Sequence, residues 1–567
     1  MPTSLKFCLI LVFHLPFIVL SAKGLDTKGL DSLGFISPVD HDIKLTGNFM
    51  ELRPNHFHAG IDIKSTKGQS GDRIKIVGNG YVSRIKIQSG GYGNVLYIDH
   101  PNGYTSVYAH LSSFTDELEA YVEEIQYALE SFEVDIYLQE DQFQYIKGEK
   151  IGEMGNSGRS FGPHLHFELR ETKTKKPLNP ELFGIGPTDK RAPTLESLHL
   201  HQLSPEGDIV AKEIKYFNPK SKSYRLYRDT IDIETGFLGV GLQMFDRMDG
   251  SWNKNGVYGF ELSVDDSLLI RWEADEFSFD ETRYINAFWD YERKQLHGQK
   301  VYLMYKAKCN PFSYYNDETG DGIIDLSGGK TRRVSLRAYD LYGNASRLNF
   351  VARSSGLADA TRHAVLDCDT THNHNVGYFD VRFGPNSFFY PTALDISYEV
   401  KDVDGQKCPS VIIGDRYIPV NGKYQIYCPL PKSDPNKWSL IKVDANGKKR
   451  QFAADTIGNK LLVRPDELGV LSLYKDTIAP SIQPISFSPT LSSPWKVKVT
   501  DNLSPDGGTN DLLYIAKLNG SWIRMRYDAK NDLLSFSDRD RLPQGPLNFK
   551  LTVIDHCGNI SRYERHI

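Results

Sequence analysis

The sequence predicts a mainly β protein that is built from antiparallel sheets and divided into several domains. With 567 residues, the chain is too long for one hydrophobic core. Its 31 Tyr and 29 Phe favour strands, and the turn pairs Asn-Gly, Asp-Gly and Gly-Gly separate short segments of alternating apolar and polar residues. The formal net charge of -5 gives no reason to expect a nucleic acid as partner.

Residues 1–22 have the pattern of a signal peptide. Lys6 supplies a positive charge, an apolar core follows as FCLILVFHLPFIVL, and small residues suit cleavage near Ala22. An uncleaved anchor is the alternative, but the apolar run is short for a membrane span and Pro16 interrupts it. We therefore expect secretion across the inner membrane to the periplasm or the cell surface, with no transmembrane span after signal cleavage.

The region from about residue 34 to residue 184 predicts short strands joined by tight turns. The turns are Asn79-Gly80, Gly90-Gly91 and Asn102-Gly103. A helical insertion at 114–146 interrupts the strands, with apolar residues at helical spacing and Ser113 or Thr115 as candidate caps. The insertion could form a wall or lid over a groove, or it could simply be a packed surface segment.

After residue 188 the sequence predicts β-rich modules with a loose internal repeat. The string D-x-x-A-P begins at Asp189 and again at Asp476, and the string D-x-x-G-N begins at Asp340 and again at Asp555. We expect a β-sandwich-like module at 189–358, a β-rich module at 359–475, and an immunoglobulin-like β-sandwich module at 476–567.

The cysteines do not form a recognisable disulfide framework. Signal cleavage would remove Cys8 and leave five, which are scattered and include no C-x-x-C pair. Cys408 and Cys428 could pair, and the sequence leaves that open.

Two short motifs bring together residue types that can hold a metal. His164 and His166 in GPHLHFELR share one face of a strand, and His58 and Asp62 in HAGID have an even spacing that also puts them on one face. Two imidazole nitrogens and one carboxylate oxygen suit a zinc site with an open fourth position. The H-x-H motif recurs at His199/His201 and His372/His374, but without a nearby H-x-x-x-D, so we expect these to be surface or strand histidines.

Four longer strings extend these motifs. HFHAGIDI, GYGNVLYIDHPNGYTSVYAHLS, KGEKIGEMGNSG and FGPHLHFE occur in this order, and over residues 45–184 they closely resemble the lysostaphin-like zinc endopeptidases with a LytM domain. The resemblance implies a LytM-type antiparallel β-sheet domain at 23–188 with its core at 45–184. It implies zinc held by His58, Asp62 and His166, and it implies His110 and His164 as non-ligand catalytic histidines. Ser157 stands where many relatives have Thr.

The resemblance also implies an activity. Family members cleave peptide bridges of peptidoglycan, so we expect an exported zinc-dependent endopeptidase that hydrolyses these cross-links by attack of a zinc-activated water, with stem peptides or cross-bridges as substrate. The loop Gly90–Asn94 could line the groove or be a plain hairpin turn. The C-terminal modules could position the enzyme on the wall or on a partner protein. The alternative is a non-catalytic or autoinhibited scaffold that binds peptidoglycan or a partner and regulates other cell-wall hydrolases.

Overall fold

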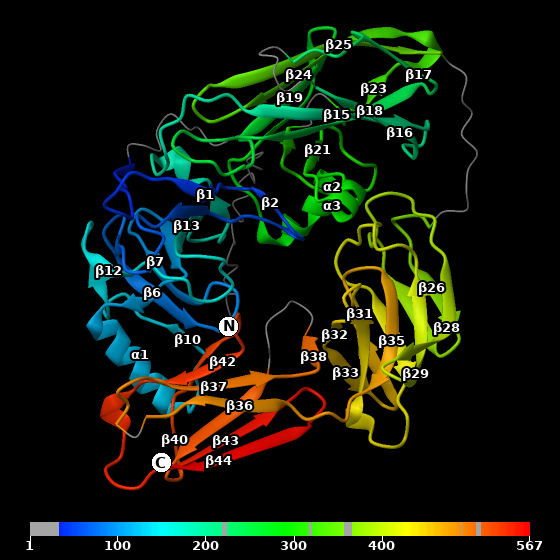
Figure 1. The fold of residues 1–567 in the computed structure, drawn as a ribbon. Coiled ribbons are helices and arrows are strands. Elements are labelled where there is room, and N and C mark those ends of the chain that lie inside the picture. Colours follow the sequence, from blue (N-terminus) through cyan, green and yellow to red (C-terminus); the bar gives the residue numbers. More distant parts are fainter. Residues whose placement is uncertain (1–32, 218–223, 317–319, 356–365, 489, 506–511) are drawn as a thin grey trace, which may run out of the picture.

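The computed structural model describes residues 33–217, 224–316, 320–355, 366–488, 490–505 and 512–567 (Figure 1). The predicted signal peptide at 1–22 lies outside these residues. Within the described residues, no helix has both the length and the apolar character needed to cross a bilayer. The chain is mostly strand with few helices, and its sheets are almost wholly antiparallel, which confirms the predicted fold class.

The predicted peptidase region forms one large antiparallel sheet, ordered β1-β4-β13-β8-β7-β6-β10, with β11 beside β6 and β14 beside β13. A small sheet, β5-β12-β9, and the hairpin β2-β3 complete it. The elements are β1 (Leu45–Gly47), β2 (Leu52–Arg53), β3 (His56–Phe57), β4 (Ile61–Lys64), β5 (Arg73–Lys75), β6 (Gly80–Ile87), β7 (Asn94–Asp99), β8 (Tyr104–Ala109), β9 (Ser113–Phe114), α1 (Asp116–Ala128), β10 (Val134–Tyr137), β11 (Gln144–Tyr145), β12 (Lys150–Glu153), β13 (His164–Glu171), β14 (Pro177–Leu178) and the 3-10 helix η2 (Pro180–Phe183).

Strand β13 lies at the centre of this sheet, between β4 and β8. His166 is paired with Asp62 of β4 on one side and with Ala109 of β8 on the other. The intervening residues Leu165 and Phe167 are fully buried on the opposite face. The period of two therefore puts the apolar side chains into the core and the histidines together on the other face.

The helical insertion is packed on both sides. Leu118 and Val122 of α1 are buried against the peptidase core, whereas Leu129 at the C-cap is 64% exposed. Thr115 is the N-cap residue, but its side chain makes no capping hydrogen bond. The remaining face of α1 contacts the last module through Arg524, which pairs with Glu123 at 3.1 Å.

The first module after the peptidase region packs two sheets face to face. Their orders are β16-β15-β18-β21, with β23 beside β18, and β17-β25-β24-β19-β20-β22. The elements are β15 (Thr194–Leu203), β16 (Ile209–Tyr216), β17 (Thr230–Ile233), β18 (Phe237–Phe245), β19 (Gly259–Val264), β20 (Ser267–Glu273), η3 (Phe279–Tyr284), α2 (Ile285–Phe288), α3 (Tyr291–His297), β21 (Val301–Leu303), β22 (Tyr315–Asn316), β23 (Ile324–Asp325), η4 (Ser327–Gly329), β24 (Thr331–Tyr339) and β25 (Ala345–Ser354).

This module shares its hydrophobic core with the peptidase region. Phe49, Leu52 and Phe57 from the β2-β3 hairpin are buried in one cluster with the core of the first module. The Phe57 ring stacks on Phe312 with ring centroids 5.3 Å apart. A division at residue 188 stays a prediction, but the hairpin that precedes His58 is packed by residues far beyond it.

The middle module also packs two sheets, ordered β26-β27-β30-β34-β33 and β28-β29-β35-β31-β32-β38. The elements are β26 (His372–Val376), β27 (Phe379–Phe383), β28 (Ile396–Val403), β29 (Gln406–Ile413), β30 (Gln425–Pro429), η5 (Pro435–Lys437), β31 (Trp438–Val443), β32 (Lys449–Gln451), β33 (Ala454–Ile457), β34 (Lys460–Val463) and β35 (Gly469–Lys475). Cys309 and Cys368 form a disulfide that ties the first module to the start of the middle one. Cys408 and Cys428 are free and buried, so the pairing left open above does not form.

The last module has two four-stranded sheets, β36-β37-β42-β41 and β40-β39-β43-β44. The elements are β36 (Ser481–Ser486), β37 (Trp495–Thr500), β38 (Leu503–Pro505), β39 (Leu513–Leu518), β40 (Ser521–Trp522), β41 (Arg526–Asp528), β42 (Leu533–Phe536), η6 (Arg539–Arg541), β43 (Asn548–Ile554) and β44 (Ile560–His566). Its immunoglobulin-like topology stays a prediction.

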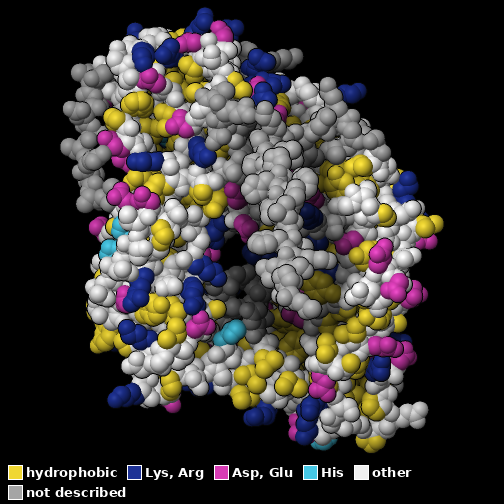
Figure 2. All heavy atoms as spheres, turned by 180° about the vertical axis from the view of Figure 1, so that it is seen from behind, with side chains coloured by type: hydrophobic (Ala, Val, Ile, Leu, Met, Phe, Trp, Pro, Cys, Tyr) yellow, Lys and Arg dark blue, Asp and Glu magenta, His cyan; other side chains and the backbone are white. Residues whose placement is uncertain are grey.

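The four units follow one another around a ring, and the last module returns to the peptidase region (Figure 1). Seen from behind, the molecule has an opening near its centre (Figure 2). The ring is closed by contacts between α1 and the last module, including Arg524 with Gln126 at 2.8 Å and Tyr127 edge-on to Trp522. Residues about 400 positions apart in the sequence thus lie side by side.

Candidate metal centre

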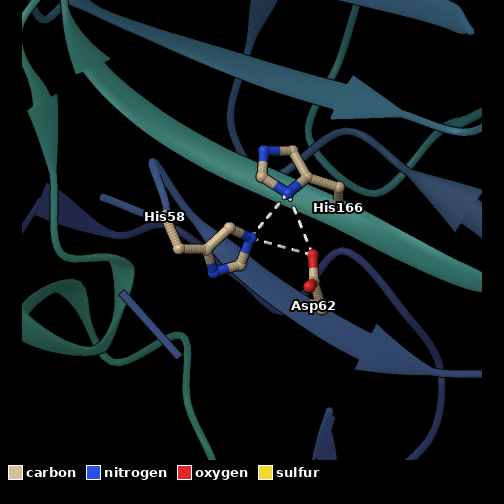
Figure 3. Close-up of side chains that lie close together, drawn as sticks. All are labelled: His58, Asp62 and His166. Carbon is tan, nitrogen blue, oxygen red and sulfur yellow. Dashed lines mark hydrogen bonds and ion pairs between the residues drawn. The ribbon is translucent and has the colours of Figure 1, made fainter. Parts of the chain in front are cut away.

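Three predicted ligands meet at one point of the large sheet (Figure 3). His58 Nε2 lies 3.0 Å from both Asp62 Oδ1 and His166 Nδ1, and His166 Nδ1 lies 2.9 Å from Asp62 Oδ1. Tetrahedral zinc bonds of about 2.0–2.1 Å would put ligand atoms about 3.3 Å apart. The donor set and its spacing therefore fit a zinc ion, and all three side chains are buried.

Asn48 sets the orientation of His58. The Nδ1 of His58 lies 2.8 Å from the carbonyl oxygen of Asn48, which can only accept a hydrogen bond. Nδ1 must therefore carry the proton, and Nε2 keeps its lone pair for a metal. Asn48 is itself held in place by two hydrogen bonds to Gly256 of the first module, at 2.9 and 2.8 Å.

Glu168 sets the orientation of His166 in the same way. Its Oε1 accepts from His166 Nε2 at 2.8 Å, which leaves Nδ1 free to face the other two ligands. Glu168 is fully buried, pairs with Arg170 at 2.5 Å, and accepts a hydrogen bond from Tyr92. Burial opposes its ionisation, but Arg170 and His166 outweigh burial and lower the pKa of Glu168 to about 2.

The carboxylates around the three ligand atoms stabilise a positive charge there. Burial disfavours the His166 cation, yet hydrogen bonds to Asp62 and Glu168 outweigh burial and raise the pKa of His166 to about 9. The carboxylate of Asp62 is held ionised because the neighbouring histidines lower its pKa well below the usual range despite its burial. Arg53 binds the second oxygen of Asp62, Oδ2, at 2.7 Å, so Oδ1 is the oxygen that faces the histidines.

His110 and His164 lie beside the three ligands. Their ring centroids are 4.8 Å apart, and His110 is 6.0 Å from His166. Nδ1 of His110 donates to the carbonyl of Ser157 at 2.8 Å, and Nδ1 of His164 donates to the carbonyl of Gly162 at 2.8 Å. With its proton on Nδ1, the neutral ring of His110 keeps an unprotonated Nε2. The Nε2 of His164 lies 3.5 Å from Asp62 Oδ1.

Burial also fixes the charge state of His110. Desolvation, together with the nearby His166 and His164, lowers the pKa of His110 to about 3. The neutral ring can accept a proton at Nε2. His110 has a φ of +62°, a left-handed conformation in which the backbone turns at the end of β8 and aims the ring at the centre.

The loop Gly90–Asn94 packs tightly beside this centre. A Cβ at Gly93 would lie 2.4 Å from Ser157 Oγ, and Gly93 has a φ of +64°. Ser157 Oγ accepts from the amide of Asn94 at 2.9 Å and donates to the carbonyl of Leu111 at 2.9 Å. The Ser157 hydroxyl thus joins the loop to the strand end that bears His110, while the loop's role in a groove stays a prediction.

The other H-x-H pairs lie elsewhere. His199 and His201 are buried on β15, where His199 bonds Ser197 at 3.0 Å and His201 bonds Tyr305 at 2.8 Å. His372 and His374 lie on the strand β26. Neither pair belongs to a metal-binding group within the part of the chain that the structure describes.

Sequence reasoning missed the residues that orient the ligands. Glu168 and Arg170 continue the even spacing of His164 and His166, so all four side chains share one face of β13. That spacing could have identified them. Asn48 and Arg53 carry no comparable signal, because they act through a loop and a short hairpin whose position depends on the first module.

The model of peptidase family M23 matches residues 56–127 and 136–180. DD-carboxypeptidase/endopeptidase Mpg of Neisseria meningitidis serogroup B is 33% identical over 123 residues, which are 22% of this chain and 22% of that protein. Murein hydrolase activator NlpD of Escherichia coli is 32% identical over 120 residues, 21% of this chain and 24% of that protein.

Among solved structures, the catalytic domain of lysostaphin from Staphylococcus simulans is 20% identical with a TM-score of 0.19, covering 25% of this chain and 91% of that chain. The match to the curated relatives spans less than a quarter of their length. The family model leaves out residues 128–135, which begin at the end of α1. The residues that it matches include all five histidine and aspartate side chains of the centre. The chain therefore carries a LytM-like domain of peptidase family M23 at residues 56–127 and 136–180.

Proposed function

We propose that the protein is an exported zinc-dependent endopeptidase that hydrolyses peptide cross-links of peptidoglycan. One observation carries the proposal. Three ligand atoms converge, and two more histidines beside them have their Nδ1 protons held by carbonyl oxygens. A site that only bound a peptide would not need two further histidines oriented in this way next to a metal-binding triad.

His58, Asp62 and His166 would hold the zinc. Zinc in such a site supplies Lewis-acid polarisation of the scissile carbonyl and activates water at neutral pH. Asn48 and Glu168 act as positioning residues, since each fixes the tautomer of one ligand histidine.

His110 and His164 would carry the protons. The neutral ring of His110 accepts a proton from the attacking water at Nε2 and passes one to the leaving amine. An imidazole that has gained a proton donates a hydrogen bond to the oxyanion of the tetrahedral intermediate. The carbonyls of Ser157 and Gly162 hold the two rings in these orientations, so little reorganisation is needed during the reaction.

The cell wall is the proposed substrate for two reasons. The relatives are named as an endopeptidase and as a murein hydrolase activator. The signal-peptide pattern and the disulfide between Cys309 and Cys368 suit an exported protein in an oxidising compartment. These observations support a periplasmic or cell-surface location.

The test is mass spectrometry of purified sacculi after digestion by the mature full-length protein. We expect new cross-link cleavage products that disappear on chelation and return with zinc. His164→Ala should lose at least about 100-fold in rate, the usual contribution of a general acid or base. His372→Ala, which alters the first histidine of another H-x-H motif, should leave the products unchanged. Zinc-loaded wild type that releases no product from any type of sacculus would contradict the endopeptidase.

A regulatory scaffold is the second candidate, and one contact favours it. Lys530 of the last module donates to the carbonyl of Asn156, the residue before Ser157, which holds His110. This contact, together with the ion pair between Arg524 of the last module and Glu123 of α1, could keep the groove in an inactive state. If wild type is inactive, then Arg524→Ala should release activity under autoinhibition, whereas a pure activator would stay inactive and stimulate a second hydrolase in the same assay.

A further inference from the structure

The repeated motifs of the first and last modules bring together two equivalent groups of buried aspartates. Asp189, Asp246 and Asp340 each offer a carboxylate oxygen within 4.8 Å of the other two, and Asp476, Asp501 and Asp555 do the same. In each group one aspartate starts the module, one directly follows a strand (β18 for Asp246 and β37 for Asp501), and one starts the final hairpin. We propose that each group binds one Ca²⁺ ion.

An asparagine makes the same set of hydrogen bonds in the two groups. The backbone amide of Asn344 donates to Asp340 Oδ1 at 2.8 Å, and its side-chain amide donates to Asp340 Oδ2 at 2.7 Å and to the carbonyl of Asp189 at 3.4 Å. Asn559 makes the same three bonds, to Asp555 at 2.8 and 2.8 Å and to the carbonyl of Asp476 at 3.4 Å. The asparagine of D-x-x-G-N thus fastens the end of each module to its beginning.

One oxygen in the first group has no partner. Asp189 is 7% exposed, and its Oδ1 accepts from the amides of Lys190, Arg191 and Asp249 at 2.9, 3.2 and 3.0 Å. Its Oδ2 is buried and meets no donor among the described residues. Because Oδ1 is occupied by these amides, Oδ2 is the oxygen left to face the other two carboxylates. A buried carboxylate oxygen without a partner is costly unless it binds a cation.

The last module repeats this feature. Asp501 Oδ2 accepts from the amide of Leu503 at 3.2 Å, while its Oδ1 is buried without a donor among the described residues. Lys437 lies nearby, but its amino group donates to Asn559 Oδ1 at 2.5 Å and forms no ion pair with the three carboxylates. In the described part of the chain, no lysine or arginine forms an ion pair with any of these six aspartates.

Crowded like charges make each group unfavourable without a cation. Burial raises the pKa of Asp246 to about 8, and the carboxylates of Asp189 and Asp340 add to the shift. Burial likewise raises the pKa of Asp501 to about 6, with Asp555 and Asp476 contributing. A divalent cation between the oxygens would remove this repulsion and supply the missing partner.

The donor chemistry selects calcium. Each group consists only of oxygen donors, which suits a hard cation, whereas the zinc site described above also contains imidazole nitrogens. Calcium accepts six to eight oxygens in flexible geometry, including backbone carbonyls and water, while magnesium demands near-octahedral ligands. A cavity of about 10 Å³ bordered by Asp246, Asp340 and Glu181 lies beside the first group and has room for about one water.

The first ion would lie at the joint between the peptidase domain and the first module. The cavity is also lined by Asn48, whose carbonyl orients His58. Tyr342, two residues after Asp340, donates to Glu181 of η2 at 2.9 Å. A cation that orders Asp340 and Asp246 would therefore also order the contacts that hold the peptidase domain on its neighbour.

The test is calorimetric titration of the full-length mature protein with Ca²⁺ after divalent ions have been stripped and zinc has been restored. We expect two ions per chain, with dissociation constants of about 10⁻⁴–10⁻³ M, typical of extracellular modules. Asp246→Asn and Asp501→Asn should each lose one ion, and the double variant should lose both. Asp141→Asn, at an exposed turn in the peptidase domain, is the matched control and should keep both.

Thermal unfolding separates a binding role from a structural one. Without Ca²⁺, Asp246→Asn should be at least as stable as wild type, because the change removes a like charge and keeps an oxygen acceptor for the amide of Arg247. With millimolar Ca²⁺, the Tm of wild type should rise above that of the variant. Wild type that binds no Ca²⁺ at millimolar concentration, or variants that bind as wild type does, would overturn the proposal.

Discussion

Glu168 accepts the Nε2 proton of His166 at 2.8 Å and thereby leaves Nδ1 as the only nitrogen of that ring that can bind a metal. The two residues lie on the same face of β13, and the carboxylate is fully buried between Arg170 and Tyr92. The tautomer of a ligand is thus set within the strand that carries it.

Glu168→Gln should weaken zinc binding. The amide can still accept a hydrogen bond, but it lacks the charge that makes the imidazole a strong donor to the metal, so we expect a loss of about 10–100-fold in zinc affinity. Competition with a chromogenic chelator measures this. Glu171→Gln, further along β13 at a half-buried position, is the control. Equal affinity of wild type and Glu168→Gln would show that the pair does not tune the metal.

Removing the modules should unfold the β2-β3 hairpin. A fragment of residues 23–188 would expose Phe49, Leu52 and Phe57, which are buried against the first module. We expect it to bind an apolar dye and to hold zinc weakly, because His58 follows this hairpin directly. A fragment of residues 23–358 should retain zinc. In the full chain, Phe57→Ala should cost about 3–5 kcal/mol, measured by denaturant unfolding. A stable, zinc-loaded 23–188 fragment would contradict the shared core.

Arg524→Ala should release α1 from the last module. Arg524 is 4% exposed and binds Glu123, Gln126 and Asp538, so its loss leaves Asp538 buried without its partner. Breaking a buried ion pair in this way costs about 3–5 kcal/mol. Hydrogen exchange of α1 should become faster, while Arg526→Ala, an exposed neighbour, should leave it unchanged. Unaltered protection of α1 in Arg524→Ala would mean that the ring does not depend on this contact.

His199 should make the protein less stable in mild acid. Burial lowers the pKa of His199 from 6.5 to about 4, so the native state resists protonation that the unfolded state accepts. Between these two pH values the unfolded state binds more protons, and stability therefore rises with pH and is lost as pH falls through the window. His199→Gln should reduce this slope in unfolding experiments at pH 4.5–6.5, and His372→Gln should not. An unchanged slope would show that His199 titrates normally.

Much of the metal centre could be predicted because it depends on local spacing. His164 and His166 lie at an even separation on β13, so the period of two alone puts both on one face. The same rule placed His58 on a strand with Asp62, and that prediction was wrong, because His58 lies in the link between β3 and β4 and only Asp62 is on β4. The period of two also puts Glu168 and Arg170 on this face of β13, although no motif in the sequence had identified them as part of the site. The helix of the insertion was predictable, but it spans only residues 116–128, and the remainder of 114–146 contains β10 and β11, which pair with β6. The partner of α1 was not predictable, since Arg524 lies about 400 residues away.

The β class, the strand face that bears His164 and His166, and the repeated strings that begin at Asp189, Asp340, Asp476 and Asp555 can all be predicted from the sequence. The burial of Phe57 in the next module, the orientation of His58 by Asn48, and the completion of the two acidic groups by Asp246 and Asp501 depend on tertiary packing. The physical reason is the range of the interactions. Strand periodicity acts between neighbours in sequence, whereas core packing and charge clusters depend on segments that meet only once the chain has folded.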